Sequence, residues 1–316
     1  MKHKHLLALA CSLSWLVSCQ NESESLPLQS AELSMSVIAR IGEPSVIQGR
    51  YAGSEPNSAE FTTGDQIGLF VDDEPAVCWT YENLSWTPSS KVYWPDKVSS
   101  HQFRAFYPYS PATSSTQVPM PSLLGQTGSM TSVSQCDFLA ASTSQSYGDD
   151  GIVSFQGEGK SFLHISSLVQ IQINADEDLS NATLNRLTLS GANIVAPSVY
   201  SFTDGVQLTP DSKSDQLVVD LNYDMTSGSH TLYLVVNEKL NTTTDVSLTL
   251  EYTVGNQSYQ ATKSSFSGNV FQGGMKHSFT LTVLNRTLHI SGGTITPWQP
   301  GNELEDIIID ATQQAS

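Results

Sequence analysis

Residues that could carry chemistry are few in this sequence and scattered along it. Five histidines follow residue 18, without the spacing of zinc ligands: His101, His164, His230, His277 and His289. Acids gather at 72–74 and 149–150 without the spacing of a calcium loop, which favours solvated loops. The sequence also lacks the nucleophile elbow, P-loop, Rossmann and H-E-x-x-H motifs. These observations predict a protein that is not an enzyme and holds neither metal nor cofactor.

The N-terminal cysteine motif predicts a different chemistry, lipid attachment. A basic start is followed by an apolar run from Leu6 to Val17, too short to span a bilayer, and by the letters LVSC ending at Cys19. Small residues before a cysteine resemble a bacterial lipobox. We therefore expect residues 1–18 to be a signal peptide and Cys19 to carry acyl chains that anchor the chain in a membrane. An ordinary secretory signal is the alternative.

Two further cysteines remain after that processing. Cys78 and Cys136 would be exported with the chain, and an oxidising compartment permits a disulfide between them. Two buried free thiols are the alternative. Two cysteines at this spacing do not make a metal site by themselves.

The charge of the mature chain is strongly acidic. Cleavage removes two of the 14 basic residues and leaves 12 against 31 acidic ones. Such a surface repels phosphate and has no basic stripe, so we expect no nucleic acid among the partners. The polar, acidic stretch after the lipidated cysteine predicts a flexible tether over residues 19–30.

Period-two alternation of apolar and polar residues predicts an all-β fold. Turn-forming clusters separate the alternating segments, and no window of twelve or more residues keeps a helical period. The pattern is clearest in the second half: Val169–Asn174, Leu187–Val195, Gln216–Tyr223, His230–Val236, Asp245–Val254 and His277–Leu284.

The first half is less regular, and the length predicts two domains. Its expected strands lie at Gln66–Asp72, His101–Tyr109 and Gly151–Gln156, between long loops rich in Ser, Thr and Pro. Gly157 and Gly159 lie where the irregular first half gives way to the regular alternation of the second half. We expect β-sandwich domains at residues 31–157 and 158–316.

Four segments, in order, resemble the fimbrillin-like family of Gram-negative anaerobes. They are FTTGDQIGLFV (61–71), YENLSWTPSSKVYWP with HQFRAFYPY (81–109), FLHISSLVQIQI (162–173) and TLHISGGTITPWQPG (287–301). The resemblance implies two transthyretin-like Greek-key β-sandwich domains in tandem. It also implies a lipid-anchored subunit of a fimbria at the outer membrane, which supports cell adhesion and whose partners are other fimbrial subunits.

The resemblance further implies that an arginine-specific protease removes the first strand and that the vacated groove accepts a strand from the next subunit. Residues 31–40 alternate apolar side chains and would be the removable strand, with Arg40 or Arg50 as the cut site. A permanent strand is the alternative. Beyond Trp298, the side chains of Leu304, Ile307, Ile308 and Ile309 would form the donor strand, with an ordinary edge strand or a frayed terminus as the alternative.

An aromatic-rich stretch from Trp79 to Tyr109 supports a rival function. Exposed rings would suit stacking on sugars, as in a monomeric surface lipoprotein that binds glycans or host proteins. Packing in the core explains the same residues, and the exposure of Trp79 and Trp86 separates the two hypotheses. We further expect His164 to be a hydrogen-bonded core histidine and Trp298 to plug the second sandwich.

Overall fold

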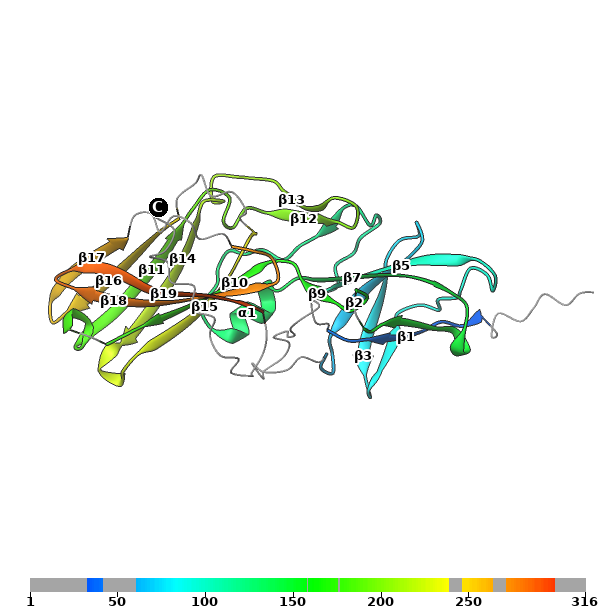
Figure 1. Cartoon of the computed structure of the whole chain (residues 1–316), viewed down its shortest axis with the longest axis horizontal. Coiled ribbons are helices and arrows are strands. Elements are labelled where there is room, and N and C mark those ends of the chain that lie inside the picture. Colours follow the sequence, from blue (N-terminus) through cyan, green and yellow to red (C-terminus); the bar gives the residue numbers. More distant parts are fainter. Residues whose placement is uncertain are drawn as a thin grey trace, which may run out of the picture. The chain divides into compact units, whose positions relative to one another are not determined.

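The computed structural model describes residues 33–41, 61–157, 159–175, 177–238, 246–263 and 271–298. Its regular structure is almost entirely strand, so the all-β prediction is confirmed (Figure 1). Several residues singled out above lie outside the described residues: Cys19, Arg50, Leu304, Ile307, Ile308 and Ile309.

The first half is built around a six-stranded sheet in the order β4-β3-β2-β5-β7-β9. A two-stranded parallel sheet, β1 (Ser36–Ala39) with β8 (Ile152–Phe155), shares one apolar core with it. That core contains Val37 and Phe155 from the small sheet and Trp79 from the large one. The strands of the large sheet are β2 Gln66–Val71, β3 Val77–Glu82, β4 Ser85–Pro88, β5 Ser100–Tyr107, β7 Leu139–Ser146 and β9 Leu163–His164.

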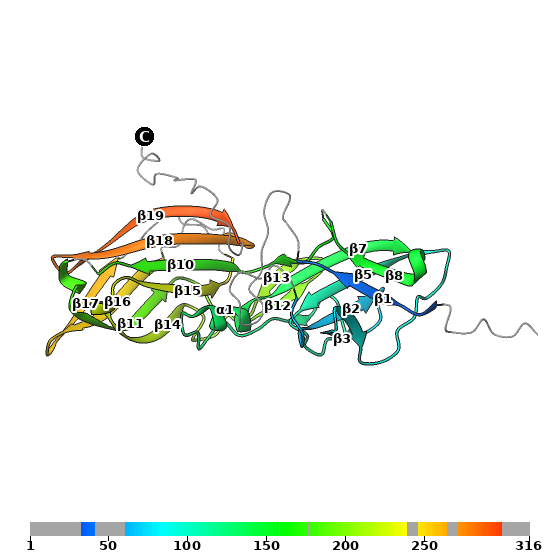
Figure 2. The same cartoon turned by 90° about the horizontal axis from the view of Figure 1, so that it is seen from below.

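The second half has two facing four-stranded sheets, which form separate layers in Figure 2. Leu168 and Leu281 from one layer and Leu187 and Leu250 from the other are fully buried in a common core. The first layer has the order β15-β10-β18-β19, with β15 His230–Val236, β10 Ser167–Ile173, β18 Met275–Leu284 and β19 Thr287–Pro297. The second has the order β14-β11-β16-β17, with β14 Gln216–Asp224, β11 Ala182–Ser190, β16 Ser247–Val254 and β17 Gln257–Lys263.

Shorter elements complete the described fold. Strand β12 (Ser198–Ser201) pairs with β6 (Val118–Pro119) and with β13 (Gly205–Leu208). The helix α1 (Met130–Cys136) begins at Ser129, whose side chain accepts the N–H of Ser132 as an N-cap. Single 3₁₀ turns lie at Asp149–Gly151, Glu177–Leu179 and Met225–Ser227.

Segments of the first half also pack in the core of the second half. Leu123, Val133 and Cys136 are buried in the same cluster as the two four-stranded sheets. Conversely, β9 follows residue 157 but pairs with β7 of the six-stranded sheet. The domain bounds at 157 and 158 stay a prediction.

One edge of the second half is closed by a side chain. The Gln126 amide accepts the N–H of Val235 and donates to its carbonyl, each at 2.7 Å, and Gly128 accepts the N–H of Tyr233 at 2.8 Å. Gln126 also donates to Leu123 at 2.7 Å. The segment before α1 therefore lies along β15 as a further strand would. It satisfies the backbone N–H of Tyr233 and both backbone groups of Val235.

Candidate functional site at the first strand

Strand β1 inserts alternate side chains into the first-half core. Met35, Val37 and Ile41 are 7%, 6% and 4% exposed, whereas Ser36 and Ile38 between them face solvent. Alternation of this kind follows from the period of two along a strand. The strand thereby fills a row of apolar positions, as a removable strand must.

The backbone on either side of β1 is also hydrogen-bonded. Beyond the ladder to β8, the Arg40 N–H donates to the Phe155 carbonyl and the Arg40 carbonyl accepts the Phe162 N–H, both at 3.0 Å. At the other end, Met35 donates to Val92 at 3.1 Å and Leu33 accepts from Trp94. Arg40 itself has an exposed side chain but a fully paired backbone.

A glycine near the start of β1 permits the close approach of two chain segments. Gly151 has φ +78°, and a Cβ there would lie 2.5 Å from the Ser34 carbonyl oxygen. Its own carbonyl accepts the Trp94 indole N–H at 2.8 Å. Only glycine fits this position without displacing β1. The sequence makes Gly151 the first residue of an expected strand, and it gives no sign of this contact.

A groove of about 330 Å³ runs beside the middle of β1. It is lined by Phe61 and Trp86, whose rings meet edge to face with centroids 5.0 Å apart. Its walls include Ile38 of β1 and Leu84 of the turn between β3 and β4, which are 39% and 89% exposed. The groove has a mixed lining, more polar than apolar, in which Arg40 and Gln156 join the apolar side chains.

The aromatic stretch does not form an exposed platform. Trp79 is 0% and Trp86 7% exposed, and Trp94 is also buried against Phe103, with ring centroids 4.8 Å apart. The rings serve core packing. Neither Trp79 nor Trp86 therefore offers the exposed ring that stacking on a glycan needs.

The two cysteines are buried free thiols, the second of the two alternatives. Cys136 packs in the second-half core, where its thiol contacts the Ser122 carbonyl at 3.5 Å, while Cys78 lies on β3. Burial raises the pKa of the Cys136 thiol to about 11 and also raises the pKa of Cys78. Both thiols are therefore protonated and poor nucleophiles near neutral pH.

His164 and Trp298 lie together where β9 meets the end of β19. The His164 Nδ1 is 2.8 Å from the Oδ1 of Asp137, which is fully buried, so the expected hydrogen-bonded core histidine is present. Trp298 is 1% exposed in the second-half core, as expected for a plug. The partner Asp137 had no signal in the sequence.

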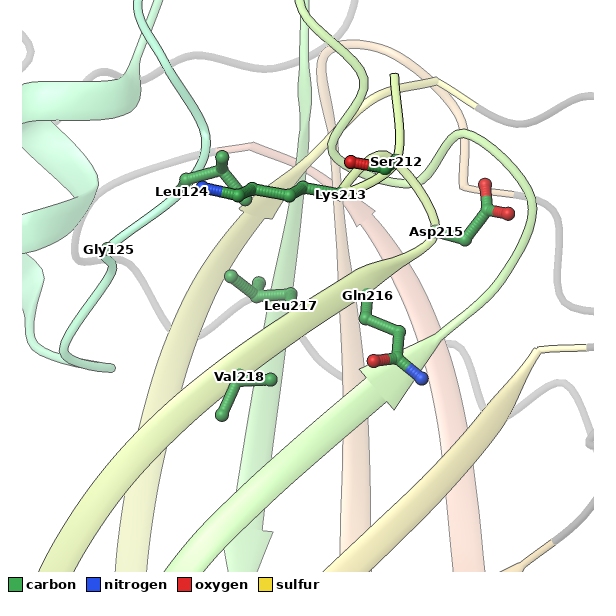
Figure 3. A pocket seen from close by; sticks show the side chains of 8 residues that line it. All are labelled: Leu124, Gly125, Ser212, Lys213, Asp215, Gln216, Leu217 and Val218. Carbon is green, nitrogen blue, oxygen red and sulfur yellow. The ribbon is translucent and has the colours of Figure 1, made fainter. Parts of the chain in front are cut away.

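A larger cavity of about 640 Å³ lies beside β14 (Figure 3). Lys213 extends toward Leu124, and the Asp215 carboxylate points away from it. The Asp215 carboxylate accepts the Asn193 N–H at 2.7 Å. With one acid and one cation pointing apart, the cavity offers no pair of acids for glycoside hydrolysis.

The described residues hold neither a cluster of metal ligands nor a helix that could span a membrane. No three or more His, Cys, Asp or Glu side chains in this part of the chain stand together as metal ligands. No helix among the same residues is long and apolar enough to cross a membrane.

Comparison with known proteins gives a family. A family model described as fimbrillin-like matches residues 53–298. No curated protein matches the sequence.

Solved structures resemble the chain at low sequence identity. A proposed cell adhesion protein from Bacteroides ovatus has 16% identity and a TM-score of 0.60, over 85% of this chain and 99% of its own. One from Bacteroides uniformis has 16% identity and a TM-score of 0.56, over 85% and 100%. The tip fimbrial protein of Porphyromonas gingivalis has 12% identity and a TM-score of 0.43, over 75% and 95%. At such identities the likeness of the first two concerns the fold alone.

Proposed function

The chain belongs to the fimbrillin-like family, and on that premise we propose that it is a structural subunit of a bacterial fimbria, assembled by exchange of β1 and active in cell adhesion. In this proposal β1 leaves its place after cleavage by an arginine-specific protease. A strand of another subunit then takes the same positions.

The observation that carries the proposal is the way β1 is held. Its buried side chains alternate, and they enter a core whose other members come mostly from the six-stranded sheet and from β8. An incoming strand with the same alternation would find the same apolar positions and the same edge of β8. Met35 and Val37 at about 1.5–3 kcal/mol each would contribute roughly 3–6 kcal/mol before ordering costs.

The finer parts of the proposal concern residues at the two ends. Acyl chains on Cys19 would anchor the chain in the outer membrane, at the cell surface. Cleavage at Arg40 or Arg50 would free β1, and the segment with Leu304, Ile307, Ile308 and Ile309 would serve as the donor. Other fimbrial subunits, identical or related, are the proposed partners.

Protease treatment of the purified precursor tests this function. We expect cleavage by an arginine-specific protease to yield a ladder of oligomers that resist SDS, because a strand inserted into a neighbouring subunit dissociates slowly. The variants Arg40→Lys and Arg50→Lys, alone and together, identify the cut site. Cleavage that releases β1 without any ladder would contradict the proposal and favour a monomeric surface lipoprotein that binds glycans or host proteins.

A further inference from the structure

A small cavity lies at one end of the second-half sandwich, where connections from both sheets meet. The 3₁₀ turn Glu177–Leu179 links β10 to β11, the turn at Asn285 and Arg286 links β18 to β19, and β16 and β17 form a hairpin beside them. The volume of the cavity is about 230 Å³. Loops at the end of a β-sandwich are a common place for binding residues. The polar residues that line this cavity are Asp178, Ser180, Asn181, Tyr252, Tyr259 and Arg286.

Arg286 occupies a position in its turn that usually holds glycine. Asn285 and Arg286 have φ +52° and +63°, and two-residue turns with two positive φ values favour glycine at the second position. A residue with a side chain is strained there. The Arg286 N–H donates to Asp178 Oδ2 at 2.7 Å, and the guanidinium lies over the Tyr259 ring, 4.9 Å from its centroid. These contacts hold a guanidinium at the cavity, in a turn whose conformation alone would favour glycine.

Tyr252 brings a buried hydroxyl to the same cavity. The residue is 1% exposed and its ring stacks on Tyr259, with centroids 5.4 Å apart. The hydroxyl makes no hydrogen bond within the part of the chain that the structure describes. Burial raises the pKa of this hydroxyl and the Asp178 carboxylate raises it further, so the group stays protonated near neutral pH. A buried polar group of this kind is stabilised when a bound molecule supplies its partner.

The hydrogen-bonding groups of the cavity include both donors and acceptors. Asp178 uses Oδ2 for the Arg286 N–H and has no described partner at Oδ1. Arg286 forms no ion pair with a described residue. The side chains of Tyr252, Ser180 and Asn181 can both donate and accept. Because each hydroxyl of a sugar also does both, a polyhydroxy ring can satisfy donors and acceptors together.

Charge and size narrow the ligand further. The described lining has one carboxylate and one guanidinium, and the whole chain has 31 acidic against 14 basic residues, so an anion gains little net attraction. Val254 and Tyr259 offer apolar surface, against which the C–H groups of a pyranose ring can pack. The volume of about 230 Å³ lies below the roughly 300–1,000 Å³ of pockets for larger ligands. The cavity therefore suits a single neutral sugar ring.

We propose that this cavity, the end cavity, binds a neutral pyranose at the terminus of a glycan. Asp178 and Arg286 bind neighbouring hydroxyls of the sugar, and the Tyr252 hydroxyl binds a third. The inference goes beyond the proposed function, because sugar binding requires neither cleavage nor exchange of β1. It supplies a ligand through which an adhesive subunit would hold a glycosylated surface.

Saturation-transfer NMR on the uncleaved mature chain tests the end cavity. The probes are the methyl glycosides of glucose, galactose, mannose, fucose, N-acetylglucosamine and N-acetylgalactosamine. At least one of them should bind saturably. Tyr252→Phe removes only the hydroxyl and should weaken that binding about fivefold or more. Its free energy of unfolding should match that of the parent, since the hydroxyl has no hydrogen bond to lose within the described chain.

Arg286→Gly is the sharper variant, because glycine suits the turn. It should fold at least as stably as the parent and bind the sugar at least about tenfold more weakly. Leu84→Gly is the matched control. Leu84 is the second residue of the turn between β3 and β4, also with φ +63°, and it does not line the end cavity. This control relieves the same kind of strain and should leave binding unchanged.

Two results would overturn the end cavity as a sugar site. One is that the parent chain binds none of the probes, and the other is that Arg286→Gly and Leu84→Gly bind equally well. The double variant Arg40→Lys with Arg50→Lys separates this site from strand exchange, since it should bind the sugar while it forms no ladder with the protease. Ladders from the parent chain without sugar binding would refute the site and leave the proposed function standing. Sugar binding without ladders would do the reverse.

Discussion

The ring of Trp298 lies flat on the ring of His164, with centroids 4.1 Å apart and planes inclined by 12°. This contact joins the end of β19 to β9, which pairs with the six-stranded sheet. We expect Trp298→Ala to lower the free energy of unfolding by about 3–5 kcal/mol, because it opens a cavity and removes a ring stack. Urea unfolding measures this. Val98→Ala, at an exposed position, should change stability by less than about 0.5 kcal/mol.

The paired backbone of Arg40 should slow its cleavage in the folded chain. A protease needs an extended, free segment, and Arg40 is hydrogen-bonded through both its N–H and its C=O, next to the buried Ile41. Cleavage then requires local opening, which we expect to slow it about 100-fold or more relative to the unfolded chain. Mass spectrometry of the fragment that ends at residue 40, in an Arg50→Lys background, measures the rate.

Two substitutions in β1 check that the opening of this strand limits the rate. Val37→Asp buries a charge and should accelerate cleavage after Arg40. Ser36→Asp, at an exposed position of the same strand, should not. If both variants were cleaved as slowly as the parent chain, protection would have to come from another source.

The amide of Gln126 should matter for stability although it lies in a loop. Gln126→Met keeps the length of the side chain but leaves the N–H and C=O of Val235 unpaired. We expect a loss of about 2–4 kcal/mol in unfolding free energy and faster hydrogen exchange at the Val235 amide. Gln172→Met, on an exposed position of β10, is the control and should change neither. Normal protection of the Val235 amide in Gln126→Met would contradict the role of this side chain.

His277 predicts a pH dependence of stability. Burial lowers its pKa from 6.5 to about 4, and its Nε2 accepts the Gln272 N–H at 3.0 Å as a neutral imidazole. Between these values the unfolded chain takes up a proton and the folded chain does not. Stability therefore falls as the pH falls from about 6.5 to about 4, by about 3 kcal/mol from this residue, and His277 adds no further change below that.

The variant His277→Asn isolates this contribution, because it keeps an acceptor and does not titrate. Urea unfolding at several pH values should show a smaller loss of stability on acidification than in the parent. His230, whose pKa burial also lowers, is present in both proteins and cancels in the difference. An identical pH profile for the two proteins would refute the assignment.

Local alternation predicted most strands well. The pattern at Gln216–Tyr223 became β14 (Gln216–Asp224), and His230–Val236 matched β15 residue for residue. The prediction for Leu187–Val195 was wrong after Ser190, where β11 ends. Asn193 there has φ +59°, a conformation that suits a turn. The pattern of apolar residues does not reveal it.

Elements that depend on distant partners could not be predicted. Strand β7 has the sequence LAASTSQS, whose small polar residues give no apolar period, and it is held by β5 and β9. The parallel pairs of β1 with β8 and of β10 with β18 join segments with no local signal for each other. The helix α1 is too short for a visible helical period.

The candidate site was predicted in part. Alternation in residues 31–40 indicated a strand, and Met35 and Val37 are indeed its buried positions. The groove could not be foreseen, because it depends on Leu84 and Phe61 reaching β1 from other parts of the chain.

Gln126 also bears on how the protein stays dispersed when crowded with copies of itself. Its amide pairs with the edge strand β15, which could otherwise form hydrogen bonds with a strand of another molecule. Loss of this amide should therefore cause aggregation of the protein as well as loss of stability.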